Sequence, residues 1–252
     1  MGRGIIALGL SLKASSGAGV FLPTDIAGCV FWLDASQESY NDNDPVTTMH
    51  DWVGGYDLLA DGEPAHPPTF KTSIISGQPV VRFDGADDQL TTLEGNIFGG
   101  FHNQTWFVVY IIRTHSAIDP IFSTMILGYD DVDIECISFR HSTTPDVIVN
   151  RMISKSDELE VIIAGPGENN GALAIIDQNS GTGNMWVNGV NGNDTYEDQT
   201  NLDPVYARAG ERSQGYWGNY DLAEVLIYNT SLSSGNRALV ENYLKAKYGL
   251  TY

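Results

Sequence analysis

Three carboxylates occupy alternate positions in one short segment of the chain: Asp131, Asp133 and Glu135. Because alternate side chains of a β-strand point to the same face, these groups would share one face if the segment is extended. Such a group suits acid–base catalysis or, together with Asp130, coordination of Ca²⁺, which prefers carboxylate and carbonyl oxygens. The simpler interpretation is a polar turn, GYDDVD, that leads into the strand IECISFR.

A second acidic group is a further calcium candidate: Asp194, Glu197, Asp198 and Asp203. Neither this group nor the set Asp130, Asp131 and Asp133 has the spacing of an EF-hand loop. The chain holds 32 acidic residues, so acidic clusters also arise by chance. We therefore expect that no cofactor is required, and a structural calcium ion is the alternative.

Aromatic residues beside polar ones are candidates for glycan binding, because the apolar face of a sugar stacks on an aromatic ring. These candidates are Tyr196 and, in the loop SQGYWGNYD, Tyr216, Trp217 and Tyr220. The alternative for Trp217 is structural, with its ring closing the end of the core before the last strand. The five histidines show no metal-ligand spacing, and the chain has neither a G-x-S-x-G motif nor a P-loop.

The composition restricts the partners of the protein. With 13 Lys and Arg against 32 Asp and Glu, the formal net charge is −19. Such a surface repels phosphate backbones and anionic headgroups, so we expect no nucleic-acid partner and no membrane insertion. No run approaches the ~20 apolar residues of a membrane span. Cys29 and Cys136 stand far apart, which predicts two buried thiols, with one disulfide as the alternative.

We expect one domain, residues 25–252, preceded by an extended arm, residues 1–24. The arm is rich in Gly, Ser and Ala and carries one apolar patch: Ile5, Ile6, Leu8, Leu10 and Leu12. The start imitates a short signal peptide, but we interpret it as an uncleaved arm because the chain keeps its initiator methionine. The arm either packs on its own domain or docks on a neighbouring subunit by adding a strand to a sheet edge.

From Cys29 onward, short apolar runs alternate with Gly, Asn, Asp and Pro clusters, which predicts a sandwich or barrel of short strands. The expected strands are Cys29–Asp34 and residues 80–83, 106–113, 134–139, 147–152, 160–164, 172–176, 184–187 and 222–228. The run TWFVVYIIR is apolar at successive positions, a pattern typical of strands covered on both faces.

The end of the chain has a helical period instead. Its expected apolar face consists of Leu239, Val240, Tyr243, Leu244 and Tyr248. Ser233 or Ser234 suits the N-cap, and Gly249 suits the stop. The sequence therefore predicts one amphipathic helix that finishes the domain.

Four segments occur in an informative order: CVFWLDAS, VVRFDGADDQL, NMWVNGV and YDLAEVLIYNTSLSSGNRALVENYLKAKYGL. This series resembles the concanavalin A-like, laminin G-type domains of bacterial and phage proteins. The resemblance implies an all-β jelly-roll sandwich of two antiparallel sheets with one C-terminal α-helix covering one end. It also implies that the strand with Trp32 and Leu33 lies beside the strand with Val225 and Ile227. Relatives include lectins, adhesion modules, β-glucanases and virion proteins, so fold alone does not decide function.

Residues 131–135 are similar to the Glu-Ile-Asp-x-Glu strand of laminarinase and lichenase-type β-glucanases. That resemblance would make Asp131 the nucleophile, Asp133 the supporting carboxylate and Glu135 the acid/base. Aspartate is one methylene too short, however, and retaining chemistry needs carboxyl groups about 5–5.5 Å apart. A misplacement of about 1 Å can cost on the order of a hundredfold in rate. We therefore expect a protein that is not an enzyme.

Together these features predict a non-catalytic virion-associated protein, a phage capsid decoration or tail component. It would assemble through its arm with other virion proteins and with itself. The alternative is a carbohydrate-binding adhesion module on a bacterial cell or particle surface, with host surface glycans as partners. An active or decayed β-glucanase is the second alternative.

Overall fold

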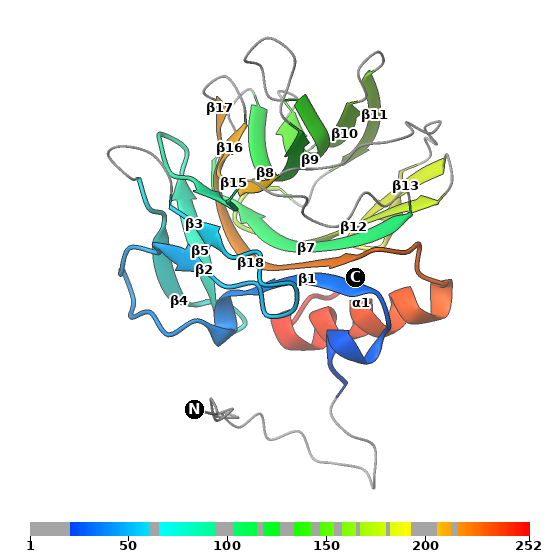
Figure 1. The fold of residues 1–252 in the computed structure, drawn as a ribbon, viewed down its shortest axis with the longest axis horizontal. Helices are drawn as coiled ribbons and strands as arrows, with labels where there is room; N and C mark the ends of the chain where they lie inside the picture. Colours follow the sequence, from blue (N-terminus) through cyan, green and yellow to red (C-terminus); the bar gives the residue numbers. More distant parts are fainter. Residues whose placement is uncertain are drawn as a thin grey trace, which may run out of the picture.

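The computed structural model describes residues 21–60, 66–93, 103–114, 118–126, 134–142, 147–153, 158–164, 167–179, 182–192, 206–212 and 216–252. Figure 1 shows two curved β-sheets stacked face to face, with the helix α1 (Ser234–Tyr248) packed beneath them. This arrangement confirms the predicted fold class, a sandwich of two antiparallel sheets closed by one C-terminal helix. The division into an arm and a domain stays a prediction, because residues 1–20 lie outside the described part.

Sheet A has eight strands in the order β14-β13-β12-β7-β18-β5-β4, and β1 also pairs with β18. Its strands are β1 (Cys29–Asp34), β4 (Thr69–Ile75), β5 (Gln78–Asp84), β7 (Gln104–Ile112), β12 (Gly171–Asn179), β13 (Thr182–Val187), β14 (Val190–Asn191) and β18 (Asn219–Tyr228). In the β1–β18 pair Trp32 lies opposite Leu226 and Leu33 opposite Val225, which confirms the predicted neighbourhood of the two strands.

Sheet B has eight strands in the order β11-β10-β9-β8-β15-β6-β3-β2. They are β2 (Thr48–Met49), β3 (Leu58–Leu59), β6 (Leu90–Thr91), β8 (Ile118–Ile126), β9 (Ile134–Ser142), β10 (Val147–Ile153), β11 (Glu158–Ala164) and β15 (Tyr206–Ala209). A small separate sheet pairs β16 (Glu211–Arg212) with β17 (Tyr216–Trp217), and two short 3₁₀ helices are η1 (Pro23–Asp25) and η2 (Ala35–Gln37). All nine expected strands exist. The sequence missed β4, β8 and β15 and the two-residue strands β2, β3, β6, β14, β16 and β17.

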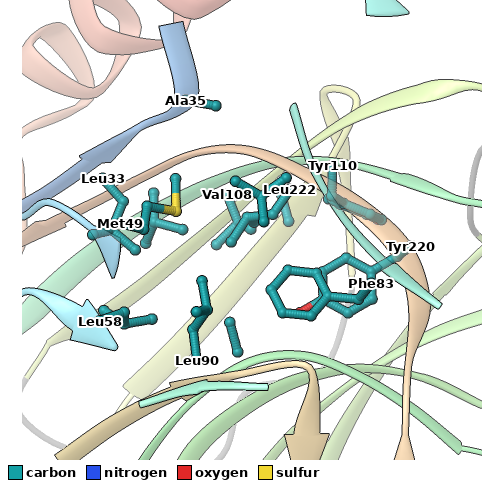
Figure 2. Packing of buried hydrophobic residues seen from close by; sticks show 14 of the residues in the cluster. Leu33, Ala35, Met49, Leu58, Phe83, Leu90, Val108, Tyr110, Tyr220 and Leu222 are labelled. Atoms are coloured by element: carbon teal, nitrogen blue, oxygen red, sulfur yellow. The ribbon is translucent and has the colours of Figure 1, made fainter. Parts of the chain in front are cut away.

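The space between the two sheets is filled by apolar side chains. Figure 2 shows Leu33, Val108 and Leu222 of sheet A above Leu58 and Leu90 of sheet B. All five side chains are fully buried. Burial of one such side chain contributes roughly 1.5–3 kcal/mol, so this layer is the main source of the stability of the sandwich.

A second core lies on the other face of sheet A, where α1 packs. Phe107, Val109 and Leu226 of the sheet belong to the same buried cluster as Val240 and Leu244 of the helix. Strand β7 is therefore buried at every position, as its sequence predicts. The prediction that the helix covers one end of the sandwich is wrong: α1 covers a face of sheet A (Figure 1), because that face is itself apolar.

The ends of α1 follow their predicted signals. Ser233 is the N-cap, and its Oγ accepts a hydrogen bond from the backbone N–H of Asn236 at 3.3 Å. Gly249 ends the helix in the left-handed conformation, with φ of 62°. Leu239 does not lie on the buried face as expected, since it is 50% exposed. Among the described residues no helix combines the length and the apolar character needed to cross a membrane.

Candidate functional site

Most of the site residues that the sequence suggests lie where the structure does not test them. Residues 127–133 and 193–205 are outside the described part, and so are both calcium groups, Tyr196, and the catalytic candidates Asp131 and Asp133. Glu135 lies in β9, of which the structure describes the backbone, paired there with Met125 of β8. The arm patch is also outside the described residues, so its docking stays a prediction.

The aromatic loop before β18 only partly matches its predicted role. The prediction that Tyr220 is an exposed sugar-binding ring is wrong, because its side chain is fully buried. Its ring stacks on that of Phe83, as Figure 2 shows. The two ring centroids are 4.8 Å apart, and the Tyr220 hydroxyl accepts a hydrogen bond from the N–H of Gly210. Tyr216 and Trp217 form β17, opposite Arg212 and Glu211, and Trp217 is half-buried. A glycan role for these two residues stays a prediction.

The structure instead reveals a pocket at the C-terminal end of α1, which we call the helix-end pocket. Its volume is about 410 Å³, within the range of small-molecule sites. Three buried side chains, Ile75, Ile111 and Tyr248, belong to its lining. Its polar lining comes from four separate segments of the chain: Ser76, Asn169, Asn170, Asn188 and Thr251.

Two of the asparagines of this pocket are held by their own hydrogen bonds. Asn188 has φ of 46°, and its Oδ1 accepts from the N–H of Leu173 at 2.9 Å. Asn169 has φ of 62°, and its Oδ1 accepts from Nη1 of Arg113 at 3.0 Å. Neither Nδ2 group has a hydrogen-bond partner among the residues that the structure describes. The pocket therefore offers two oriented amide donors to a ligand.

One aromatic ring, that of Tyr252, completes the pocket. It is 39% exposed and packs so closely on Gly189 that a Cβ there would stand 2.9 Å from its Cδ2. Lys245 lies 4.0 Å from the ring centroid and donates to the Tyr252 carbonyl at 2.8 Å. Burial, and then the nearby Glu241, raises the pKa of Tyr252 above its ordinary value, so the phenol stays neutral. A neutral ring fixed beside amide donors can bind a sugar.

A separate acidic cluster at the β5–β6 turn consists of Asp84, Asp87 and Asp88, whose ligand oxygens lie within 4.8 Å of one another. The N–H of Asp84 donates to Asp88 Oδ2 at 2.9 Å, and Asp84 Oδ1 accepts from the N–H of Ala86 at 2.8 Å. Burial, with the neighbouring Asp84 and Asp87, raises the pKa of Asp88 to about 7. These hydrogen bonds brace the turn.

A buried polar cluster joins α1 to sheet A. Lys247 donates to Asp34 Oδ2 at 2.6 Å and to Glu224 Oε2 at 2.7 Å. Glu224 also accepts from Nε1 of Trp32 and from the hydroxyl of Tyr248, each at 2.8 Å. Burial, and then the nearby Asp34, raises the pKa of Glu224 to about 7. Because every member bonds another, we assign this cluster to attachment of the helix and not to ligand binding.

Cys29 is a free thiol in the described part of the chain. Its Sγ donates to the carbonyl of Phe31 at 3.9 Å, and burial raises its pKa to about 12. A thiol with such a pKa is a poor nucleophile at neutral pH. Cys29 is therefore a structural residue.

Comparison with known proteins shows similarity at the level of structure. No protein-family model and no curated protein sequence matches the chain. A Trypanosoma rangeli sialidase in complex with sialic acid matches with a TM-score of 0.63 and 14% identity, over 94% of this chain and 35% of that chain. The botulinum neurotoxin serotype D binding domain matches with a TM-score of 0.60 and 13% identity, over 86% and 51%.

A third similar structure is the binding domain of botulinum neurotoxin DC in complex with rat synaptotagmin II. Its TM-score is 0.59 and its identity 10%, over 86% of this chain and 52% of that chain. The chain thus spans about a third of the sialidase and about half of each toxin binding domain. Each match extends over most of this chain, which shows that the β-sandwich fold is shared with these structures. Identities this low show the fold alone.

Proposed function

We propose that this protein is a carbohydrate-binding adhesion module, built on a laminin G-type sandwich and acting at a bacterial cell or particle surface. The observation that carries the proposal is the helix-end pocket. It combines the two oriented amide donors of Asn169 and Asn188 with the ring of Tyr252. Amides that bond the hydroxyls of a sugar while a ring contacts its apolar face are the groups that sugar recognition needs.

The charge of the pocket favours a neutral sugar over an acidic one. Arg113, which donates to the pocket residue Asn169, also donates to the carboxylate of Asp221. Asp221 accepts from Arg82 as well, at 2.7 Å. Lys245 lies over the ring of Tyr252 and donates a hydrogen bond to its carbonyl. With a net charge of −19, the protein would repel a carboxylate ligand such as the sialic acid of the trypanosomal structure. We therefore propose neutral glycans as the ligands.

We propose binding without catalysis. The glucanase-like segment carries aspartate at position 131, and its shorter side chain argues against a retaining mechanism. The virion-associated role depends on the arm patch, which the described residues do not include. The lectin-like neighbours and the helix-end pocket support the adhesion module in its place.

The test is a glycan array probed with the purified chain, followed by calorimetry with the glycans that bind. Asn188→Asp keeps the Oδ1 acceptor and tolerates the left-handed backbone, but it removes the Nδ2 donor. We expect roughly tenfold weaker binding, since an unsatisfied polar partner costs about 1–3 kcal/mol. Asn169→Asp should behave in the same way.

The matched control is Asn43→Asp, because Asn43 also has positive φ (68°) but lies in the turn before β2, with its Oδ1 bonded by Lys71. It adds the same charge and should leave binding unchanged. The proposal fails if no neutral glycan binds, or if Asn188→Asp and Asn169→Asp bind as the unmodified chain does.

A further inference from the structure

The loop between β2 and β3 presents a large aromatic ring to solvent. Trp52 is 44% exposed, and the adjacent Val53 is also exposed. By contrast, Trp32 and Trp106 are buried. An exposed indole can stack on the apolar face of a sugar, so its surroundings show whether it could bind one.

Hydrogen bonds to the carboxylate of Asp51 hold the backbone on either side of Trp52. The carboxylate of Asp51, itself buried, accepts from the N–H of Trp32 at 2.9 Å, of Val53 at 3.1 Å and of Tyr56 at 3.0 Å. The N–H of Trp52 in turn donates to the carbonyl of Trp32 at 2.9 Å. The ring is therefore presented by a fixed turn, which lowers the entropic cost of binding.

A histidine flanks the ring in an equally fixed position. The ring of His50 lies with its centroid 5.8 Å from that of Trp52, at an angle of 48°. Glu38 holds it twice: Oε1 accepts from the backbone N–H of His50 at 2.7 Å, and Oε2 lies 2.9 Å from Nδ1. The His50 side chain is 45% exposed, and its Nε2 has no hydrogen-bond partner within the described part of the chain.

We infer that Trp52 and His50 form a second sugar-binding surface, which stacks on the apolar face of one neutral sugar residue. The indole covers the C–H face of the ring, and Nε2 of His50 bonds a hydroxyl at its edge. This inference rests on the proposed function, since it assigns a second contact to the same class of ligand.

A sugar fits this surface better than a protein partner does. The exposed apolar side chains here are one tryptophan and one valine, whereas a stable protein interface needs about 1,000 Å² or more. The ring of His50, with its centroid 5.8 Å from that of Trp52, is near enough to bond a hydroxyl of a pyranose stacked on the indole. Two weak contacts on one polysaccharide also strengthen each other through effective concentration.

The experiment measures protection of the Trp52 indole from acrylamide quenching. The probes are cellohexaose, chitohexaose and the neutral glycans that the array identifies. We expect the sugars to reduce acrylamide quenching in the unmodified chain and to lose this effect in Trp52→Ala. The Trp52→Ala variant should also bind the sugars roughly tenfold more weakly. His50→Ala should weaken binding less. Leu239→Ala, which removes another exposed apolar side chain, is the control and should change nothing.

The outcomes separate this inference from the proposed function. If Asn188→Asp weakens binding but Trp52→Ala does not, the second surface is wrong and the helix-end pocket stands. If sugars still protect Trp52 in Asn188→Asp, the second surface binds sugar without the helix-end pocket, and the inference is supported. If no probe binds the unmodified chain, both ideas fail.

Discussion

Replacing Lys247 with methionine should lower the free energy of unfolding, because it removes the ion pairs that attach α1 to sheet A. The ammonium of Lys247 bridges two carboxylates, at 2.6 Å from Asp34 and 2.7 Å from Glu224. The Lys247 side chain is 11% exposed, and the two carboxylates are 2% and 0% exposed. Methionine keeps the length and the apolar stem of lysine, so the change removes the charge and little packing.

The magnitude follows from the charges that are left behind. Removing one partner of a buried ion pair costs about 3–5 kcal/mol, because the other charge remains buried without compensation. Here Glu224 can take up a proton, since its pKa is already raised to about 7, and this places the cost near the lower limit. We expect a loss of about 3 kcal/mol, or about 6–12 °C in melting temperature for a chain of this size.

The assay is urea unfolding followed by circular dichroism and by tryptophan fluorescence at neutral pH. The matched control is Lys71→Met, whose ammonium bonds Asn43 at an exposed position and should change stability by about 0.5 kcal/mol or less. The double variant Lys247→Met with Asp34→Asn should recover part of the loss, because one of the two buried charges is gone. If Lys247→Met is as stable as Lys71→Met, the ion cluster does not hold the helix and the reasoning is refuted.

Two further predictions concern stability. As pH rises from about 4.5 to about 7, the free energy of unfolding should fall by about 3 kcal/mol, since folded Glu224 keeps a proton that unfolded Glu224 releases. Glu224→Gln should reduce that slope in urea midpoints measured against pH, with the rest coming from Asp88, whose pKa is also raised to about 7, and an unchanged slope would contradict the assignment. Gly54→Ala should destabilise by about 1–3 kcal/mol, because its Cβ would stand 2.4 Å from the carbonyl of Val30. Gly55→Ala has open space but φ of 77°, so thermal unfolding should show a smaller loss of about 1 kcal/mol; equal losses would refute the packing argument.

The sequence predicts the sandwich well because its local patterns are strong. The strand β1 has the predicted bounds, and the caps of the helix are Ser233, one of the two predicted N-caps, and Gly249, the predicted stop. The strands that it misses carry mixed patterns: β8 contains Pro120, and β4 includes Ser73 with φ of 57° at an irregular register. The position of the helix could not be predicted. The continuous apolar sequence of β7 indicates that both faces of the strand are covered, but it does not indicate which element covers each face.

The helix-end pocket could not be predicted for a different reason. Its residues come from segments that are far apart in the sequence, and each has an ordinary local explanation. Asn169 and Asn188 stand in clusters that predict turns, and both indeed adopt positive φ. Only the assembled sandwich brings both residues into the lining of one cavity together with Tyr252.

Aromatic residues in polar loops show most clearly what composition alone misses. Tyr220 looks exposed in the loop SQGYWGNYD, but it is already part of β18 and shares the inward face with Leu222 two residues later. Trp52 follows Asp51 in a turn with two glycines, where the carboxylate binds backbone N–H groups and no strand period operates. An aromatic residue near the end of a strand points inward when it stands an even number of positions from a buried residue of that strand, as Tyr220 does from Leu222. Trp52 lies in a turn, where this alternation does not apply, and its ring faces solvent.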